Sequence, residues 1–150
     1  MIVTISDEQN VLRLNPKGVE SLVRAVIAYE KTTCDEVTIY FVDTPTICEL
    51  HERFFNDPTP TDCITFPLDQ EEDEDFPYRI LGEVFVCPET ALKYAEKNQV
   101  DPLEETSLYI IHGLLHLMGY DDIEPDDILE MRQAEQRHLE NIRKLELLLT

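Results

Sequence analysis

The sequence predicts an α+β fold in which helices pack against a mixed sheet of about four strands. Short runs of β-branched and aromatic residues dominate the first half of the chain, and segments with helical periodicity dominate the last third. A βαβ-like stretch near the start adds parallel pairing to the sheet. Because 150 residues is a usual length for one domain, we expect a single domain over residues 1–150.

Four runs have the composition of strands. Residues 2–5 and 36–42 are rich in Val, Ile and aromatic side chains, and residues 63–66 form a short apolar run that Pro67 closes. Residues 79–86, with the sequence RILGEVFV, match a strand in composition and length. Together these runs predict the sheet.

Five segments have helical signals. Residues 17–31 place apolar side chains at helical spacing, and residues 45–55, 88–98 and 102–119 each begin at a proline, which suits the first turn of a helix. A long final helix follows Pro125. Seven residues at helical spacing mark one face of it: Ile128, Met131, Ala134, His138, Ile142, Leu145 and Leu149.

The charge of the chain limits its partners. The sequence has 32 acidic and 12 basic residues, a formal net charge of -20, which repels nucleic-acid phosphates and anionic lipid surfaces. The acidic run over residues 69–75 is expected to be a solvated loop. No apolar run approaches the roughly 20 residues of a membrane span, and the first residues lack a basic, apolar leader pattern. We therefore expect a cytoplasmic protein that binds neither membranes nor DNA.

The most informative segment is the apolar helix that contains His112 and His116. Side chains four residues apart project from the same face of a helix, so both imidazoles could bind one cation. Gly119 favours an end of the helix, after which Asp122 could return to the same cation and leave a fourth position for water. A pair of hydrogen-bonded core histidines is the alternative interpretation of this spacing.

The same residues resemble a known family. Residues 112–122, HGLLHLMGYDD, resemble the motif His-Gly-x-Leu-His-Leu-x-Gly-Tyr-Asp-His of the YbeY family of metal-dependent endoribonucleases. Residues 60–67, PTDCITFP, resemble the family's Pro-Thr-Asp-Val-Leu-Ser-Phe-Pro, and residues 81–84, LGEV, its Leu-Gly-Asp-Ile. With the long final helix, the resemblance covers about residues 36–142 and identifies a single YbeY-like metal-dependent hydrolase domain with a zincin-like metal helix.

The resemblance implies a single-strand-specific zinc endoribonuclease that acts in 16S rRNA 3′-end maturation and late 70S ribosome quality control. It implies one zinc ion per chain, held by His112, His116 and Asp122, with metal-bound water in place of a catalytic side chain. The family has histidine at position 122, and an aspartate here makes harder cations such as manganese more competitive. The family also has an arginine where this chain has Phe55, and Arg53 points to another side of the helix. Its partners would be rRNA and the ribosome, and a protein partner could supply positive charge.

Other functions and residues are weighed against this hypothesis. A ribosome-assembly factor with a largely structural metal and little cleavage is the alternative, favoured by the acidic charge and by Phe55. A zinc peptidase is disfavoured because Gly113 stands where His-Glu-x-x-His enzymes have their glutamate. Among other polar residues, Asp121 could orient a ligand or cap a turn, and Glu83 is expected to be an exposed strand carboxylate. His51 and His138 are expected at the surface or partly packed.

Overall fold

A computed structural model describes residues 1–68 and 78–150 of the chain. The acidic run predicted to be a solvated loop, residues 69–75, lies outside the described residues. The described residues form four strands and five helices, as the sequence predicts. The elements are β1 (Ile2–Asp7), α1 (Pro16–Tyr29), β2 (Glu36–Phe41), α2 (Thr44–Phe55), β3 (Cys63–Pro67), β4 (Ile80–Val86), α3 (Pro88–Asn98), α4 (Pro102–Leu117) and α5 (Pro125–Lys144).

The sheet is mixed and has the order β1-β2-β4-β3. β1 pairs in parallel with β2, β2 pairs in parallel with β4, and β3 pairs antiparallel with β4 at the edge of the sheet. This arrangement confirms the predicted α+β class with a mixed sheet. The parallel β1–β2 pair follows from the connection through α1, which brings the chain back to the same end of the sheet. Between β2 and β4 the chain runs the other way along β3, so β4 is again parallel to β2.

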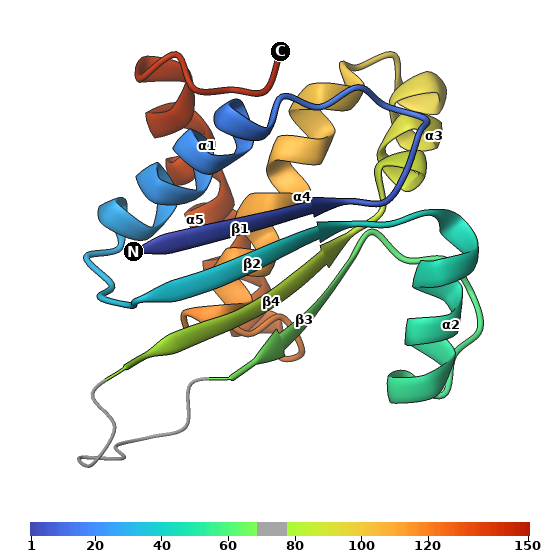
Figure 1. The fold of residues 1–150 in the computed structure, drawn as a ribbon, viewed down its shortest axis with the longest axis horizontal. Coiled ribbons are helices and arrows are strands. Elements are labelled where there is room, and N and C mark those ends of the chain that lie inside the picture. Colours follow the sequence, from blue (N-terminus) through green and yellow to red (C-terminus); the bar gives the residue numbers. More distant parts are fainter. Residues whose placement is uncertain (69–77) are drawn as a thin grey trace.

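Helices α1, α4 and α5 gather on one side of the sheet (Figure 1). α4 packs on β3 and β4, α1 packs on β1, and α5 packs on α1 and α4. Buried side chains of α1 and α4, such as Leu22, Val26 and Leu114, form the main core with Ile39 and Val84 of the sheet. A second core on the other face of the sheet lies between α2 and the strands, around four buried residues: Val42, Ile47, Ile64 and Cys87. The metal-site segment of α4 is therefore held directly on the sheet.

The helices begin where proline and capping residues predict. Asp43 and Asp101 each accept a hydrogen bond from a backbone N–H in the first turn, at 3.0 Å from Thr46 N and 2.8 Å from Leu103 N. Such caps satisfy N–H groups that have no partner within the helix. None of the helices among the described residues is long and apolar enough to span a membrane.

The face of the last helix that the spacing predicts is buried only in its middle. Met131, Ala134, His138 and Ile142 are buried, whereas Ile128 and Leu145 are 39% and 50% exposed. α5 ends at Lys144, so the helical periodicity does not extend to Leu149, which is buried because the chain after the helix turns back. The Leu149 backbone N–H donates to Ser107 Oγ of α4 at 3.2 Å.

His138 was expected at the surface or partly packed, and this prediction is wrong. Its side chain is fully buried, and its Nε2 lies 2.7 Å from Oε1 of Glu30, at the end of α1. The Tyr29 ring packs edge-on against the imidazole. Periodicity along α5 does not reveal a carboxylate partner from α1, and that partner allows the imidazole to be buried.

Candidate metal centre

Helix α4 carries the two predicted histidines on one face, one turn apart. The helix ends at Leu117, and Gly119 has a φ of 103°, in the left-handed region that favours glycine. Tyr120 N donates to Leu115 O at 3.0 Å, which closes the turn. The chain then doubles back, so Asp122 returns to the histidine face as the sequence predicts.

Gly113 holds this helix unusually close to the sheet. A Cβ atom at this position would lie 2.5 Å from Val84 Cγ1 of β4 and 2.8 Å from Cys63 Sγ of β3. Real side chains do not approach so closely, so the packing requires glycine. The position that carries glutamate in His-Glu-x-x-His peptidases is therefore packed against the sheet.

The three predicted ligand side chains converge. Nε2 of His112 lies 3.0 Å from Nε2 of His116, and Asp122 Oδ2 lies 3.4 Å from the first and 3.3 Å from the second. Atoms bound about 2.0–2.1 Å from a tetrahedral zinc lie about 3.3–3.4 Å from one another. The three residues, named here the His–His–Asp group, could therefore hold one metal ion.

The partners on the far side of each imidazole support metal binding. His116 Nδ1 lies 3.0 Å from the carbonyl oxygen of Tyr120, which can only accept a hydrogen bond, so this nitrogen carries the proton. His112 Nδ1 faces Glu135 Oε2 at 3.7 Å. A neutral ring that carries its proton on Nδ1 presents its Nε2 lone pair toward the Asp122 carboxylate. Three acceptors in contact repel one another unless a cation or proton lies between them.

Glu135 is the partner that sequence reasoning missed. It comes from α5, its side chain is only 2% exposed, and it also pairs with Arg132 at 2.6 Å. Burial alone raises the pKa of this carboxyl, but the neighbouring His112 and Arg132 side chains outweigh burial and hold the pKa below its ordinary value. For His112, burial lowers the pKa, and the opposing effect of Glu135, Asp62 and Asp122 raises it overall. The sequence signal that could have revealed Glu135 is the position of an acidic residue at the spacing of the buried side chains of α5.

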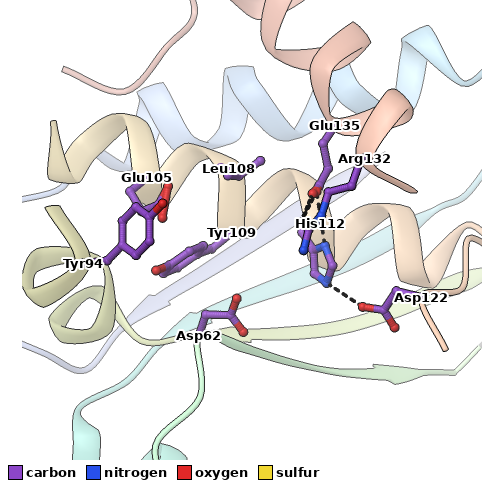
Figure 2. A pocket seen from close by; sticks show the side chains of 9 residues that line it. All are labelled: Asp62, Tyr94, Glu105, Leu108, Tyr109, His112, Asp122, Arg132 and Glu135. Carbon is purple, nitrogen blue, oxygen red and sulfur yellow. Dashed lines mark hydrogen bonds and ion pairs between the residues drawn. The ribbon is translucent and has the colours of Figure 1, made fainter. Parts of the chain in front are cut away.

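A hollow of about 430 Å³ lies on the His112 side of the group and is named here the first hollow. Figure 2 shows Tyr94, Glu105 and Tyr109 toward one end of it, and His112, Glu135 and Arg132 toward the other. Burial raises the pKa of Glu105 above its ordinary value, and nearby carboxylates add to the effect, although the Tyr109 hydroxyl opposes it. Its described lining residues are Asp62, Tyr94, Glu105, Leu108, Tyr109, His112, Asp122, Arg132 and Glu135.

A second hollow of about 410 Å³ lies on the His116 side. Asp122 lines both hollows, so the His–His–Asp group lies where the two meet. The described residues that line the second hollow are His51, Phe55, Thr61, Cys63, Ile64, Thr65, His116, Asp121, Asp122 and Ile123. A chain-like ligand that crosses the metal site could occupy both hollows.

The remaining residues considered in the sequence lie around this site in different ways. Asp121 Oδ1 accepts from the backbone N–H of Asp122 at 2.8 Å, which is the turn-capping alternative. Glu83 lies beside Tyr40, where burial and then this carboxylate raise the pKa of the tyrosine. Arg53 lies 5.5 Å from the Phe54 ring centroid, and Phe55 lines the second hollow. His51 is partly exposed and lines the same hollow.

Comparisons with known proteins agree with the resemblance. The sequence model of the family described as "Endoribonuclease YbeY" matches residues 4–143. A protein of that name from Protochlamydia amoebophila is 56% identical over 147 residues, which cover 98% of this chain and 97% of the relative. Another, from Chlamydia pneumoniae, is 38% identical over 151 residues and covers 99% of this chain and 95% of the relative.

A solved structure has the same fold. The solution structure of TM1509 from Thermotoga maritima superposes with a TM-score of 0.64 at 27% sequence identity. The match covers 94% of this chain and 89% of the other. The sheet and helices that position the His–His–Asp group are thus an arrangement already observed in a solved structure.

Proposed function

Because this chain belongs to the endoribonuclease YbeY family, we propose that it is a metal-dependent endoribonuclease specific for single-stranded RNA. We propose that it acts in the cytoplasm, in 16S rRNA 3′-end maturation and late 70S ribosome quality control, with rRNA and the ribosome as its partners. The observation that carries the hydrolytic assignment is the convergence of the His–His–Asp group, three acceptors in contact where two hollows meet.

His112, His116 and Asp122 would hold one zinc ion per chain, and three protein ligands leave a position open for substrate or water. When bound, the metal supplies Lewis acidity toward a phosphoryl oxygen and lowers the pKa of a bound water. The carboxylate cancels one of its two positive charges, which leaves the site more open to manganese than three imidazoles would be.

The residues around the group prepare it for this chemistry. The carbonyl of Tyr120 accepts from Nδ1 of His116, and the carboxylate of Glu135 faces Nδ1 of His112 at 3.7 Å, so both Nε2 atoms point toward the same place. Asp121 fixes the turn that carries Asp122. The two hollows would admit RNA nucleotides on either side of the scissile phosphate.

The alternative is a ribosome-assembly factor whose metal is largely structural. The net charge of -20 favours it, because such a surface binds free RNA weakly. The donor set favours the enzyme, because structural zinc sites use four protein ligands, whereas the group among the described residues has three. His116→Ala distinguishes the two: a catalytic site predicts a folded variant without cleavage, and a structural site predicts an unfolded variant.

The first experiment measures metal content by elemental analysis and cleavage of single-stranded and duplex fragments of the 16S rRNA 3′ end. It compares the wild type with Asp122→Ala, and the matched control is Asp126→Ala, which removes an exposed carboxylate from the first turn of α5 that lines neither hollow. We expect one metal equivalent and cleavage of the single-stranded RNA in the wild type and control, and loss of both in Asp122→Ala. Metal retained by Asp122→Ala, or no metal in the wild type, would overturn the ligand assignment.

A further inference from the structure

The second hollow has an aromatic and apolar wall beside the His–His–Asp group. Phe55, the last residue of α2, is 57% exposed, and Ile123, in the loop after α4, is 76% exposed. The His51 ring lies 5.8 Å from the Phe55 ring, and its Nδ1 lies 2.7 Å from the Thr59 carbonyl oxygen, which fixes its orientation. Because water contacts large apolar side chains here, covering them with a ligand is favourable.

The neighbouring phenylalanine is used differently. Phe54 is also exposed, at 53%, but its ring packs edge-on against Phe66 at 4.8 Å, with Arg53 on it. Phe54 is absent from the described lining of both hollows, whereas Phe55 lines the second. Phe54 therefore supports the second core, and Phe55 is available to a ligand.

The charges at the site favour stacking over phosphate contacts. Among the described residues that line the two hollows, the permanently charged cation is Arg132, and it pairs with the buried Glu135. The second hollow has no lysine or arginine among its described lining residues. An aromatic ring binds the face of a nucleobase without requiring positive charge.

We propose that the second hollow is a base-stacking site, in which one unpaired nucleobase next to the scissile phosphate stacks on Phe55, with His51 and Ile123 at its edges. This inference rests on the proposed ribonuclease function and specifies how RNA is held. A paired base cannot reach the ring without leaving its duplex, so the site selects single strands. Selectivity among the four bases is weak, because each has a π-face.

The test measures RNA affinity separately from cleavage. Short single-stranded RNAs, each with one abasic nucleotide at successive positions around the cleavage site, are titrated by fluorescence anisotropy against the zinc-loaded protein. The proteins are the wild type, Phe55→Leu, Phe55→Tyr and the matched control Phe54→Leu. A stacked base contributes about 1–3 kcal/mol, so Phe55→Leu should weaken binding of intact RNA about 5- to 150-fold.

The pattern across variants identifies stacking. Phe55→Tyr should bind like the wild type, Phe54→Leu should stay within about twofold of it, and the dependence of affinity on salt should be the same in all four proteins. One abasic position should weaken wild-type binding by the same factor as Phe55→Leu, with no further loss when the two are combined. Circular dichroism and the melting temperature check that each variant is folded.

Failure of this inference is distinguishable from failure of the proposed function. If the wild type cleaves RNA but Phe55→Leu and every abasic RNA bind as well as their parents, the stacking site is wrong and the nuclease stands. If the wild type binds RNA with this pattern but cleaves none, the stacking site stands and the nuclease assignment is wrong. If the wild type binds no single-stranded RNA, both are overturned.

Discussion

Gly113→Ala tests whether close packing of α4 on the sheet positions the metal site. The added Cβ would meet Val84 Cγ1 at 2.5 Å and Cys63 Sγ at 2.8 Å, on two neighbouring strands. Insertion of a methyl group into a packed core costs about 1–3 kcal/mol, and two contacts place this case near the upper value. The higher helix propensity of alanine offsets about 1 kcal/mol of this cost, so the free energy of unfolding should fall by about 2 kcal/mol.

The loss is measurable by thermal and urea unfolding. For a chain of this size, about 2 kcal/mol lowers the melting temperature by about 4–8 °C. The urea midpoint should fall without a change in slope, since the folded and unfolded surfaces stay the same. Because His112 and His116 flank the strained contact on the same helix, zinc affinity should fall as well.

A second background isolates the cause. In the double variant Cys63→Ala with Val84→Ala, both close contacts are gone. The atom nearest to the added Cβ is then Thr65 Cγ2, at 3.4 Å. There Gly113→Ala should be neutral or stabilising by up to about 1 kcal/mol. Equal destabilisation in both backgrounds would refute the packing argument.

Gly18 of α1 is the matched control. A Cβ at this position would find Asn15 Cβ at 3.7 Å and Leu149 Cδ2 at 3.9 Å, which are ordinary contacts. Gly18→Ala should therefore stabilise the protein by up to about 1 kcal/mol. The two Gly→Ala changes should alter the free energy of unfolding in opposite directions, which separates the effect of packing from that of helix propensity.

Three further outcomes are expected. Glu135→Gln should weaken zinc binding about 10- to 100-fold in a chelator competition, because it removes the carboxylate that orients His112. Glu30→Gln disrupts the other histidine–carboxylate pair, between the buried His138 of α5 and the residue after α1, and should lower stability without weakening zinc binding. Burial raises the pKa of Glu105, so the folded state favours the protonated carboxyl, and the stability that this gives is lost as pH rises above the ordinary pKa of 4.5. Glu105→Gln should therefore show a smaller fall in melting temperature than the wild type between about pH 4 and 8. The exposed Glu49→Gln should show the same fall as the wild type. With a net charge of -20, the melting temperature should rise as sodium chloride increases from low to physiological concentration, and a constant value would contradict dominant charge repulsion.

Local signals predicted the elements because their causes are local. Prolines that follow a capping position start helices at Pro88, Pro102 and Pro125, and each lies in the first turn of its helix. The strand order could not be predicted, because it depends on pairs such as Thr65 with Val84, which are distant in sequence. The same limit explains the error at His138, whose partner comes from another helix.

The candidate site was predictable to the extent that it is helical. The four-residue spacing of His112 and His116 and the break at Gly119 are local features that bring Asp122 to the same point. Glu135 was missed because its approach depends on how α5 packs against α4. The hollows on either side combine residues from several elements, and no periodicity in the sequence encodes their shape.

Both departures from the family pattern make the place where the proposed RNA substrate would bind less positive, the first by adding a carboxylate and the second by removing a guanidinium. Asp122 stands where the resembled motif has histidine, and Phe55 stands where the family segment has arginine. A carboxylate ligand in a chain with a net charge of -20 favours capture of the cation and disfavours approach of RNA. Binding energy for the RNA must then come from contacts that do not depend on charge, and Phe55 lies beside the metal group where such a contact is needed. The affinity of this chain for RNA should accordingly depend less steeply on salt than that of Phe55→Arg, whose added phosphate contact would increase the slope by about one.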